Sequence, residues 1–404
     1  MRPKHALVAP TPATMARSTI VLFLLSMPFE LMGAPTLPRA MPARIHRRVT
    51  ISGQSAGGSM AMQHLFAFAG SVDGAAIASG SVFGCGAFPK KNHNCYYGGI
   101  DVPATFKYIQ DRHAAGLIDD PASLRNTAVH LFHGTKDVVV TQPCMSDVLE
   151  QLKNYVSKDK IKVVFNTSAS HVWTLDHGTC ACGACSWTGS NECCDVNNCA
   201  YDLSGDILRH IFGGVPVKPR ATAPASNLRW VNQQAFLPEK NGTWTNAALM
   251  KWALVYVPTA CQGAAVNDCK VHVNYHGCTR KKWQQRLLWE RLLDLNEYGE
   301  ANDMIVVYPQ AAGDNITGTG CWNWGFKRDD TLFDTYKSAQ LATVVNLVDG
   351  LGAALTVGSG LQREHDDAAV LAEIAAEIAE MDGPFNKFDA QLHARADEDE
   401  DAAH

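Results

Sequence analysis

The chain has 404 residues, of which 46% are hydrophobic and 19% are charged, and its formal net charge is −5 at pH 7. Disorder throughout is excluded, because the chain has neither low hydrophobicity nor a high net charge. The slight excess of acid gives no electrostatic case for nucleic acid, and we expect no such partner. The length suits one large domain or two modest ones.

The N-terminus has the pattern of a secretory signal peptide. Basic residues precede an apolar run at residues 20–27, and small residues follow at Gly33 and Ala34. A proline and a glutamate end the run far short of the roughly 20 residues needed to cross a membrane. We therefore predict a signal peptide at residues 1–34, an extracellular mature chain and no membrane span.

The cysteines also indicate an oxidising compartment. Thirteen are present, too many for a typical cytosolic enzyme, and one thiol is left over if all the others pair. Six lie between residues 180 and 199, where Cys182 and Cys185 have the spacing of a zinc knuckle. A second Cys-x-x-Cys pair at the usual distance is absent, so we predict disulfides and no metal site. Asn-x-Ser/Thr sequences that fit a secreted glycoprotein occur at Asn166, Asn241 and Asn315.

Short apolar runs alternate with helical patterns from residue 48 onward, which predicts an α/β sheet. Strands are expected at residues 49–52, 75–79, 128–132, 162–166, 252–258, 270–275 and 304–308. Helices are expected at residues 58–68, 146–155, 204–212, 283–298 and 339–351. The proline-rich residues 215–224 resemble a linker.

The composition changes beyond residue 360. Apolar residues at helical spacing predict an amphipathic helix at residues 366–381, and an acidic run follows at residues 397–401. We interpret residues 353–404 as a C-terminal extension that packs loosely or stays disordered. Residues 44–352 are then expected to form a single folded domain.

Ser55 is a candidate nucleophile. It lies in Gly53-Gln54-Ser55-Ala56-Gly57, a G-x-S-x-G sequence between a predicted strand and a predicted helix. A nucleophilic serine at such a turn has strained backbone angles, so its neighbours must be small. A glycine-rich turn can also carry a serine with no catalytic role, but the flanking strand and small residues favour the nucleophile.

A serine nucleophile requires a general base and an orienting carboxylate. In α/β-hydrolases these come later in the chain, the acid before the histidine, each after a strand. Asp137 follows a predicted strand and is preferred to Asp147, which begins a predicted helix and has an ordinary role there. His171 follows the next predicted strand and is preferred to His177, which lies further into the loop.

The oxyanion of such an enzyme needs two backbone donors. The first is expected to be the N–H of Ala56, directly after the serine, and the second normally comes from a His-Gly loop after an upstream strand. Only 20 residues separate Ser55 from the predicted end of the signal peptide, but a strand ending in His276-Gly277 occurs more than two hundred residues later. We therefore predict a circularly permuted sheet, in which the usual first half follows the usual second half.

Seven short sequences together carry a specific resemblance and cover roughly residues 48–351, about three quarters of the chain. They are Gly53-Gln54-Ser55-Ala56-Gly57-Gly58, His133-Gly134-Thr135-Lys136-Asp137, Ser170-His171, Asn198-Cys199-Ala200-Tyr201-Asp202, Tyr275-His276-Gly277-Cys278, Val307-Tyr308-Pro309-Gln310 and Gly320-Cys321-Trp322-Asn323-Trp324. With them the chain resembles the secreted poly(3-hydroxybutyrate) depolymerases of the circularly permuted, fungal type, within a wider esterase family.

The resemblance implies roles for individual residues. Ser55, Asp137 and His171 would form the catalytic triad, and the N–H groups of Ala56 and Cys278 would form the oxyanion hole.

The tryptophan motif would lie near the substrate crevice, which makes Trp322 and Trp324 candidate substrate-binding residues, with a packing role as the alternative. Because a depolymerase contacts a solid polyester, exposed apolar residues are expected at the crevice mouth. Phe326 joins the two tryptophans as a candidate, either for that rim or for the acyl-chain pocket.

The sequence thus predicts a secreted serine esterase with a circularly permuted α/β-hydrolase domain at residues 44–352. This domain is expected to be rich in disulfides and to have helices on both faces of its sheet. It is expected to act as a monomer on polyester or small hydroxyacid esters, without cofactor or metal. A feruloyl- or acetyl-esterase acting on plant polysaccharide has the same fold and stays open as an alternative. A non-catalytic hydrolase-fold binding protein is the other alternative.

Overall fold

The computed structural model of the protein describes residues 47–182, 195–238, 248–263, 268–278, 289–312, 320–325 and 330–357. The predicted signal peptide, amphipathic helix and acidic run lie outside these ranges, as do Asn241, Asn315 and Phe326. The domain boundaries therefore stay predictions.

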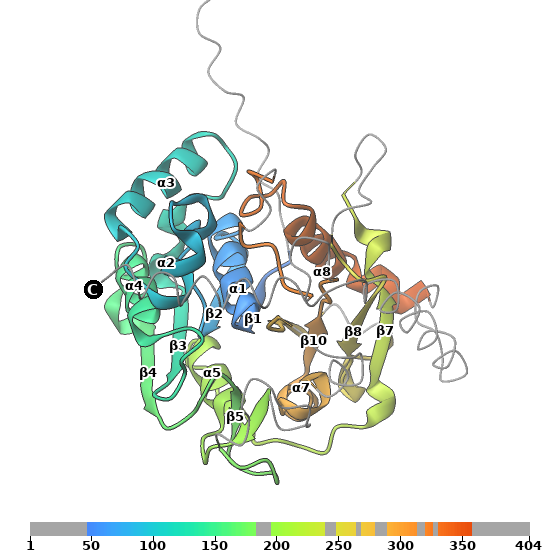
Figure 1. The fold of residues 1–404 in the computed structure, drawn as a ribbon. Helices are drawn as coiled ribbons and strands as arrows, with labels where there is room; N and C mark the ends of the chain where they lie inside the picture. Colours follow the sequence, from blue (N-terminus) through green and yellow to red (C-terminus); the bar gives the residue numbers. More distant parts are fainter. Residues whose placement is uncertain are drawn as a thin grey trace, which may run out of the picture. The chain divides into compact units, whose positions relative to one another are not determined.

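Eight strands form one mixed sheet in the order β4-β3-β2-β1-β9-β10-β8-β7 (Figure 1). The strands from the first half of the chain are β1 (Val49–Gln54), β2 (Val72–Ala78), β3 (Ala128–Gly134) and β4 (Ile161–Thr167). Those from the second half are β7 (Leu228–Asn232), β8 (Trp252–Tyr256), β9 (Lys270–Tyr275) and β10 (Met304–Tyr308). Every strand predicted from the sequence is among them, and β7 is the addition.

The two halves of the chain meet in the sheet between β1 and β9. These strands pair in parallel, with Gly53 opposite Tyr275. The pairing stays parallel from β1 through β2 and β3 to β4, and from β9 to β10, whereas β8 is antiparallel to both its neighbours. The strand that ends at Tyr275 thus lies beside the strand that precedes Ser55. This order of the halves confirms the predicted circularly permuted α/β-hydrolase sheet.

A buried chain of hydrogen bonds also joins β1 to β9. Trp289 Nε1 donates to Asn274 Oδ1 at 2.9 Å, and Asn274 Nδ2 donates to Ser52 Oγ at 2.8 Å. His272 lies between Ser52 Oγ, 2.8 Å from its Nε2, and Thr50 Oγ1, 2.9 Å from its Nδ1. Burial lowers the pKa of His272 to about 3, so the neutral ring has one donor and one acceptor for the two hydroxyls.

Helices cover both faces of the sheet, as predicted. One face packs against α1 (Ala56–Ala67), α3 (Val102–Ala114), α4 (Gln142–Lys153) and α8 (Ala339–Val357), and the other against α5 (Leu203–Ile211) and α7 (Leu295–Asn302). Because successive strand residues point to opposite faces, Ile77 belongs to the first core cluster, whereas Ala76 and Ala78 belong to the second.

Several elements differ from the prediction. The helices α2 (Lys91–Tyr97) and α3 and the short parallel pair of β5 (Trp173–Leu175) and β6 (Val196–Asn198) are not indicated by the sequence pattern. In α3, only Val102, Thr105 and Ile109 are buried, which is too sparse an apolar stripe to stand out. The helix predicted at residues 283–298 is interrupted before α7, where Asp294 has φ 61°.

The segment predicted as a linker has no regular structure, but it packs along α7. The backbone N–H of Lys218 donates to Asn302 Oδ1 at 2.7 Å, and that of Ala221 donates to Glu297 O at 3.1 Å. This segment connects α5 to β7 and so joins the two halves of the permuted sheet.

Disulfides within the described residues join Cys85 to Cys95, Cys182 to Cys199, Cys261 to Cys269 and Cys278 to Cys321. The Cys182–Cys199 bond confirms the prediction of disulfides over a zinc knuckle, since it uses one of the two cysteines of that pattern. Cys144 is a free, buried thiol. Within the described ranges, no helix is long and apolar enough to cross a membrane.

Candidate active site

Ser55 lies in a strained turn between β1 and α1. Its backbone has φ 58° and ψ −128°, a combination that non-glycine residues rarely adopt. A Cβ atom on Gly53 would lie 2.2 Å from Gly57 O, and one on Gly57 would lie 2.0 Å from Tyr275 O. The glycines of the G-x-S-x-G sequence are therefore required by close backbone contacts, as expected for a nucleophile turn.

Asp137 and His171 form a hydrogen-bonded pair. His171 Nδ1 lies 2.8 Å from Asp137 Oδ2, and Asp137 Oδ1 accepts from the N–H groups of Val139 and Val140 at 2.9 and 3.0 Å. Burial would raise the pKa of Asp137, but the neighbouring His171 and hydrogen bonds from His171, Ser79 and Val140 outweigh it, and the pKa is lowered. Asp137 is therefore ionised and oriented toward His171.

Backbone contacts hold the Asp137 loop against the His171 loop. The N–H of Thr135 donates to Thr167 O at 2.8 Å, and the N–H of Lys136 donates to Ala169 O at 2.9 Å. A Cβ atom on Gly134 would lie only 2.2 Å from Ala169 O. The two loops can approach this closely only because residue 134 is glycine.

Ser55 and the Asp137–His171 pair belong to the same edge of the sheet, because β1, β3 and β4 run in parallel and each residue follows the C-terminal end of its strand. The end of β2 lies between them: the N–H of Ser55 donates to Ala78 O at 2.9 Å. The next residue, Ser79, hydrogen-bonds Asp137. Ser79 was not predicted as a site residue, although its position directly after a predicted strand was a usable signal.

The loop after β9 lies directly against the nucleophile. A Cβ atom on Gly277 would lie 3.2 Å from Ser55 Cβ, and one on Gly57 would lie 2.0 Å from Tyr275 O and 2.4 Å from His276 O. This is the place expected for the second oxyanion donor, because that donor must face the serine.

Three interactions fix the conformation of this loop. Trp322 Nε1 donates to His276 O at 3.0 Å, the N–H of Ala311 donates to His276 Nε2 at 3.1 Å, and a disulfide joins Cys278 to Cys321. Cys278 is thus anchored directly beside the glycine that touches Ser55.

The tryptophans do not form the exposed rim that was expected. Trp322 is 0% and Trp324 4% exposed. Trp322 packs edge-on against Tyr275, and Trp324 packs edge-on against Tyr96. The rim prediction is wrong for both, because these indoles fill the core beneath the loops of the site. A packing role, left open by the sequence, is what their burial supports.

Large exposed apolar side chains do occur next to the Asp137 loop. Val138 is 73% exposed and Tyr97 46% exposed. Thr141 connects the two regions, since its N–H donates to Tyr96 O at 2.8 Å and its hydroxyl to Tyr97 O at 3.0 Å. The apolar surface near the site thus comes from residues that no sequence motif indicates.

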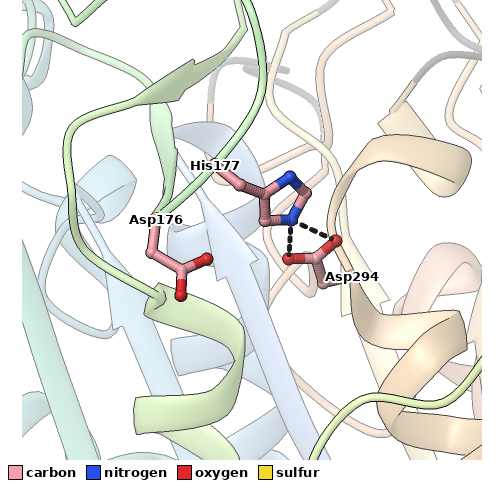
Figure 2. Close-up of side chains that lie close together, drawn as sticks. All are labelled: Asp176, His177 and Asp294. Carbon is pink, nitrogen blue, oxygen red and sulfur yellow. Dashed lines mark hydrogen bonds and ion pairs between the residues drawn. The ribbon is translucent and has the colours of Figure 1, made fainter.

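His177, the alternative base, is held elsewhere. Its Nε2 lies 2.8 Å from Asp294, and Figure 2 shows both side chains with Asp176 beside them. These three residues could together offer ligand atoms to a cation. However, the Arg220 guanidinium already binds Asp294 and holds Asp176 with two bonds of 2.8 and 3.0 Å. Since Arg220 already bonds to both carboxylates, we assign no metal there.

The fold is a circularly permuted α/β-hydrolase, and the site has the residue types and chain order of a serine esterase. No protein-family model matches the chain. Two curated relatives do. The poly(3-hydroxybutyrate) depolymerase of Delftia acidovorans is 29% identical over 308 residues, covering 75% of this chain and 59% of the relative. The polyhydroxybutyrate depolymerase of Talaromyces funiculosus is 26% identical over 314 residues, covering 74% of this chain and 88% of the relative.

Solved structures show the same likeness. A PHB depolymerase with a serine-to-alanine substitution, complexed with an R3HB trimer, matches with a TM-score of 0.65 and 23% identity over 77% of this chain and 97% of that one. The PHB depolymerase from Penicillium funiculosum matches with a TM-score of 0.62 and 23% identity over 78% of this chain and 96% of that one. Sequence and fold together confirm the resemblance to PHB depolymerases. The chain spans only about three fifths of the Delftia relative's length.

Proposed function

We propose that the chain is a secreted serine esterase that hydrolyses polyesters of hydroxyacids, such as polyhydroxybutyrate, through an acyl-enzyme. The observation that carries this proposal is the strained Ser55 turn at the same sheet edge as the hydrogen-bonded Asp137–His171 pair. The substrate class is supported by the two curated relatives, both named for depolymerisation of this polymer. The disulfides support an oxidising, extracellular location.

In the proposed mechanism, Ser55 Oγ attacks the ester carbonyl while His171 Nε2 accepts its proton and then returns it to the leaving alcohol. Asp137 fixes the imidazole, because its carboxylate accepts from Nδ1–H at 2.8 Å and leaves Nε2 as the base. A water molecule, activated by the same histidine, then releases the hydroxyacid from Ser55. No step of this mechanism requires a cofactor or a metal.

The N–H groups of Ala56 and Cys278 are proposed to bind the oxyanion. Ala56 follows the nucleophile at the N-terminus of α1, where backbone N–H groups have no partner within the helix. Cys278 is supported by the contact of Gly277 with Ser55 and by the disulfide to Cys321. Donors held in place before the reaction stabilise the developing charge without a reorganisation cost.

The proposed contact with solid polymer uses the exposed side chains of Val138 and Tyr97 rather than the tryptophans. Their position beside the Asp137 loop places apolar surface next to the site, and such surface would allow this domain to adsorb to a polyester. We propose that the protein does so as a monomer.

A substrate panel tests the function. The full chain and Ser55→Ala are assayed on short-acyl soluble esters, hydroxybutyrate oligomers, polyhydroxybutyrate film and feruloylated xylan. We expect hydrolysis of the oligomers and film by the wild type alone. Cleavage of feruloyl esters without hydroxybutyrate hydrolysis would instead indicate an esterase of plant polysaccharide. No hydrolysis of any ester would favour a binding protein.

A further inference from the structure

His133 lies behind the proposed triad and has no role in the mechanism described above. It belongs to the end of β3, its side chain is 2% exposed, and its Nε2 lies 2.9 Å from Val140 O. A carbonyl oxygen can only accept, so Nε2 carries the proton and donates it. Its other nitrogen, Nδ1, is buried and has no hydrogen-bond partner within the described part of the chain.

Val140 links this histidine to the carboxylate. Its carbonyl oxygen accepts from His133, while its own N–H donates to Asp137 Oδ1 at 3.0 Å. The remaining oxygen, Oδ2, accepts from His171 Nδ1 at 2.8 Å. One residue of the loop is therefore held at both ends, by the imidazole on one side and by the carboxylate on the other.

We infer that His133 is a positioning residue for the triad, a neutral imidazole that fixes Val140 and thereby orients the Asp137 carboxylate toward His171. The inference rests on the proposed function, since it assigns the ring a role in that catalysis. The alternative is a purely structural histidine that fills space at the end of β3.

The surroundings of His133 keep the ring neutral. Burial lowers its pKa, and the titratable neighbours Asp137 and His171 act on it in opposite directions. The edge-on ring of Phe165, 5.9 Å away between centroids, adds an apolar wall. Protonation would also place a proton on the buried Nδ1, where the described residues offer no acceptor. A neutral donor is therefore available at the pH at which the triad works.

The test compares His133→Phe with His130→Phe. His130 lies three residues earlier on the same strand, is 0% exposed and hydrogen-bonds Asp206 at 2.9 Å, so it is matched in burial and bonding but touches no triad residue. We expect His133→Phe to lower kcat on a soluble ester about tenfold with KM unchanged, since small misplacements of catalytic groups are costly. The acid limb of its pH–rate profile should move to lower pH, because a poorly oriented carboxylate stabilises the imidazolium less.

Proton NMR gives a second readout that does not depend on turnover. The downfield resonance of the His171–Asp137 hydrogen bond should weaken or move in His133→Phe and stay unchanged in His130→Phe. His133→Gln and His133→Asn extend the comparison if the phenylalanine variant does not fold. The glutamine amide is long enough to donate to Val140 O, so His133→Gln should keep the wild-type pH profile. The asparagine amide is too short to reach Val140 O, so His133→Asn should lose that profile.

Two sets of results overturn the inference: a wild-type kcat, pH profile and resonance in His133→Phe, or equal changes in the two matched variants. Failure of the proposed function is a separate outcome. It would appear as an inactive wild type or as activity that persists in Ser55→Ala, and the resonance would still report on the role of His133.

Discussion

Gly134 sets the distance between the acid loop and the base loop, and Gly134→Ala tests this directly. The added Cβ atom would lie 2.2 Å from Ala169 O, whereas real Cβ contacts rarely fall below 3.0 Å. The loops must therefore separate by about 0.8 Å. A displacement near 1 Å costs catalysis on the order of 100-fold, so we expect kcat to fall by about that factor. Overpacking should also lower the free energy of unfolding by about 1–3 kcal/mol.

The assay is the pH-dependent hydrolysis of a soluble ester, with urea unfolding measured on the same preparation. Gly70→Ala is the matched control, because its Cβ atom would meet only the end of the Asp119 side chain, at 3.2 Å. This variant should retain activity. A folded Gly134→Ala variant with wild-type kcat, or an equal loss in Gly70→Ala, would refute the reasoning.

Three further predictions concern the triad, the apolar surface and acid stability. Ser55→Ala should abolish ester hydrolysis, a loss of roughly 10⁶-fold, with the fold intact by circular dichroism; His171→Ala should do nearly as much and His177→Ala little. Trp322→Phe should reduce turnover of polymer and of soluble ester by the same factor, because Trp322 is buried. Val138→Ser should reduce turnover of polymer alone, because Val138 is exposed. The opposite pattern would show that Trp322, and not Val138, contacts the polymer. Burial would raise the pKa of Asp206, but hydrogen bonds from His130, Lys162 and Tyr201 lower it well below its usual range. The pKa of Asp206 in the folded protein is thus below its unfolded value of about 3.9. The ionised carboxylate therefore stabilises the fold above about pH 3.9, and this stabilisation is lost as the pH falls below that value. Urea unfolding of Asp206→Asn should depend less on pH below about pH 4; an unchanged dependence would show that Asp206 does not contribute.

The sequence predicts most of the sheet because most of its strands are buried and form compact apolar runs. The permutation also follows from the sequence, since the His276-Gly277 motif comes after the nucleophile and the sheet must bring the two together. β1 and β9 do meet, with Gly53 opposite Tyr275. Residue order along the chain was sufficient for this conclusion, because the chemistry requires the two loops to face each other.

The remaining features depend on contacts that no local pattern shows. The partners in the Cys278–Cys321 disulfide are 43 residues apart, and pairing is not encoded by spacing. The sequence does not indicate that Trp322 is buried, because burial depends on a long-range contact in which its indole N–H donates to His276 O inside the molecule. The motif that contains His133 does not indicate its role, because that role depends on Val140, which the chain brings back to it after a turn.

The identity of the covalently modified residue tests the central claim most directly. The full chain is treated with an organophosphate ester, residual esterase activity is followed, and the site of the adduct is mapped by mass spectrometry. We predict one adduct, on Ser55, that forms in proportion to the loss of activity and is absent from Ser55→Ala. Complete inactivation with the adduct on another residue, or no adduct in an active enzyme, would contradict the account.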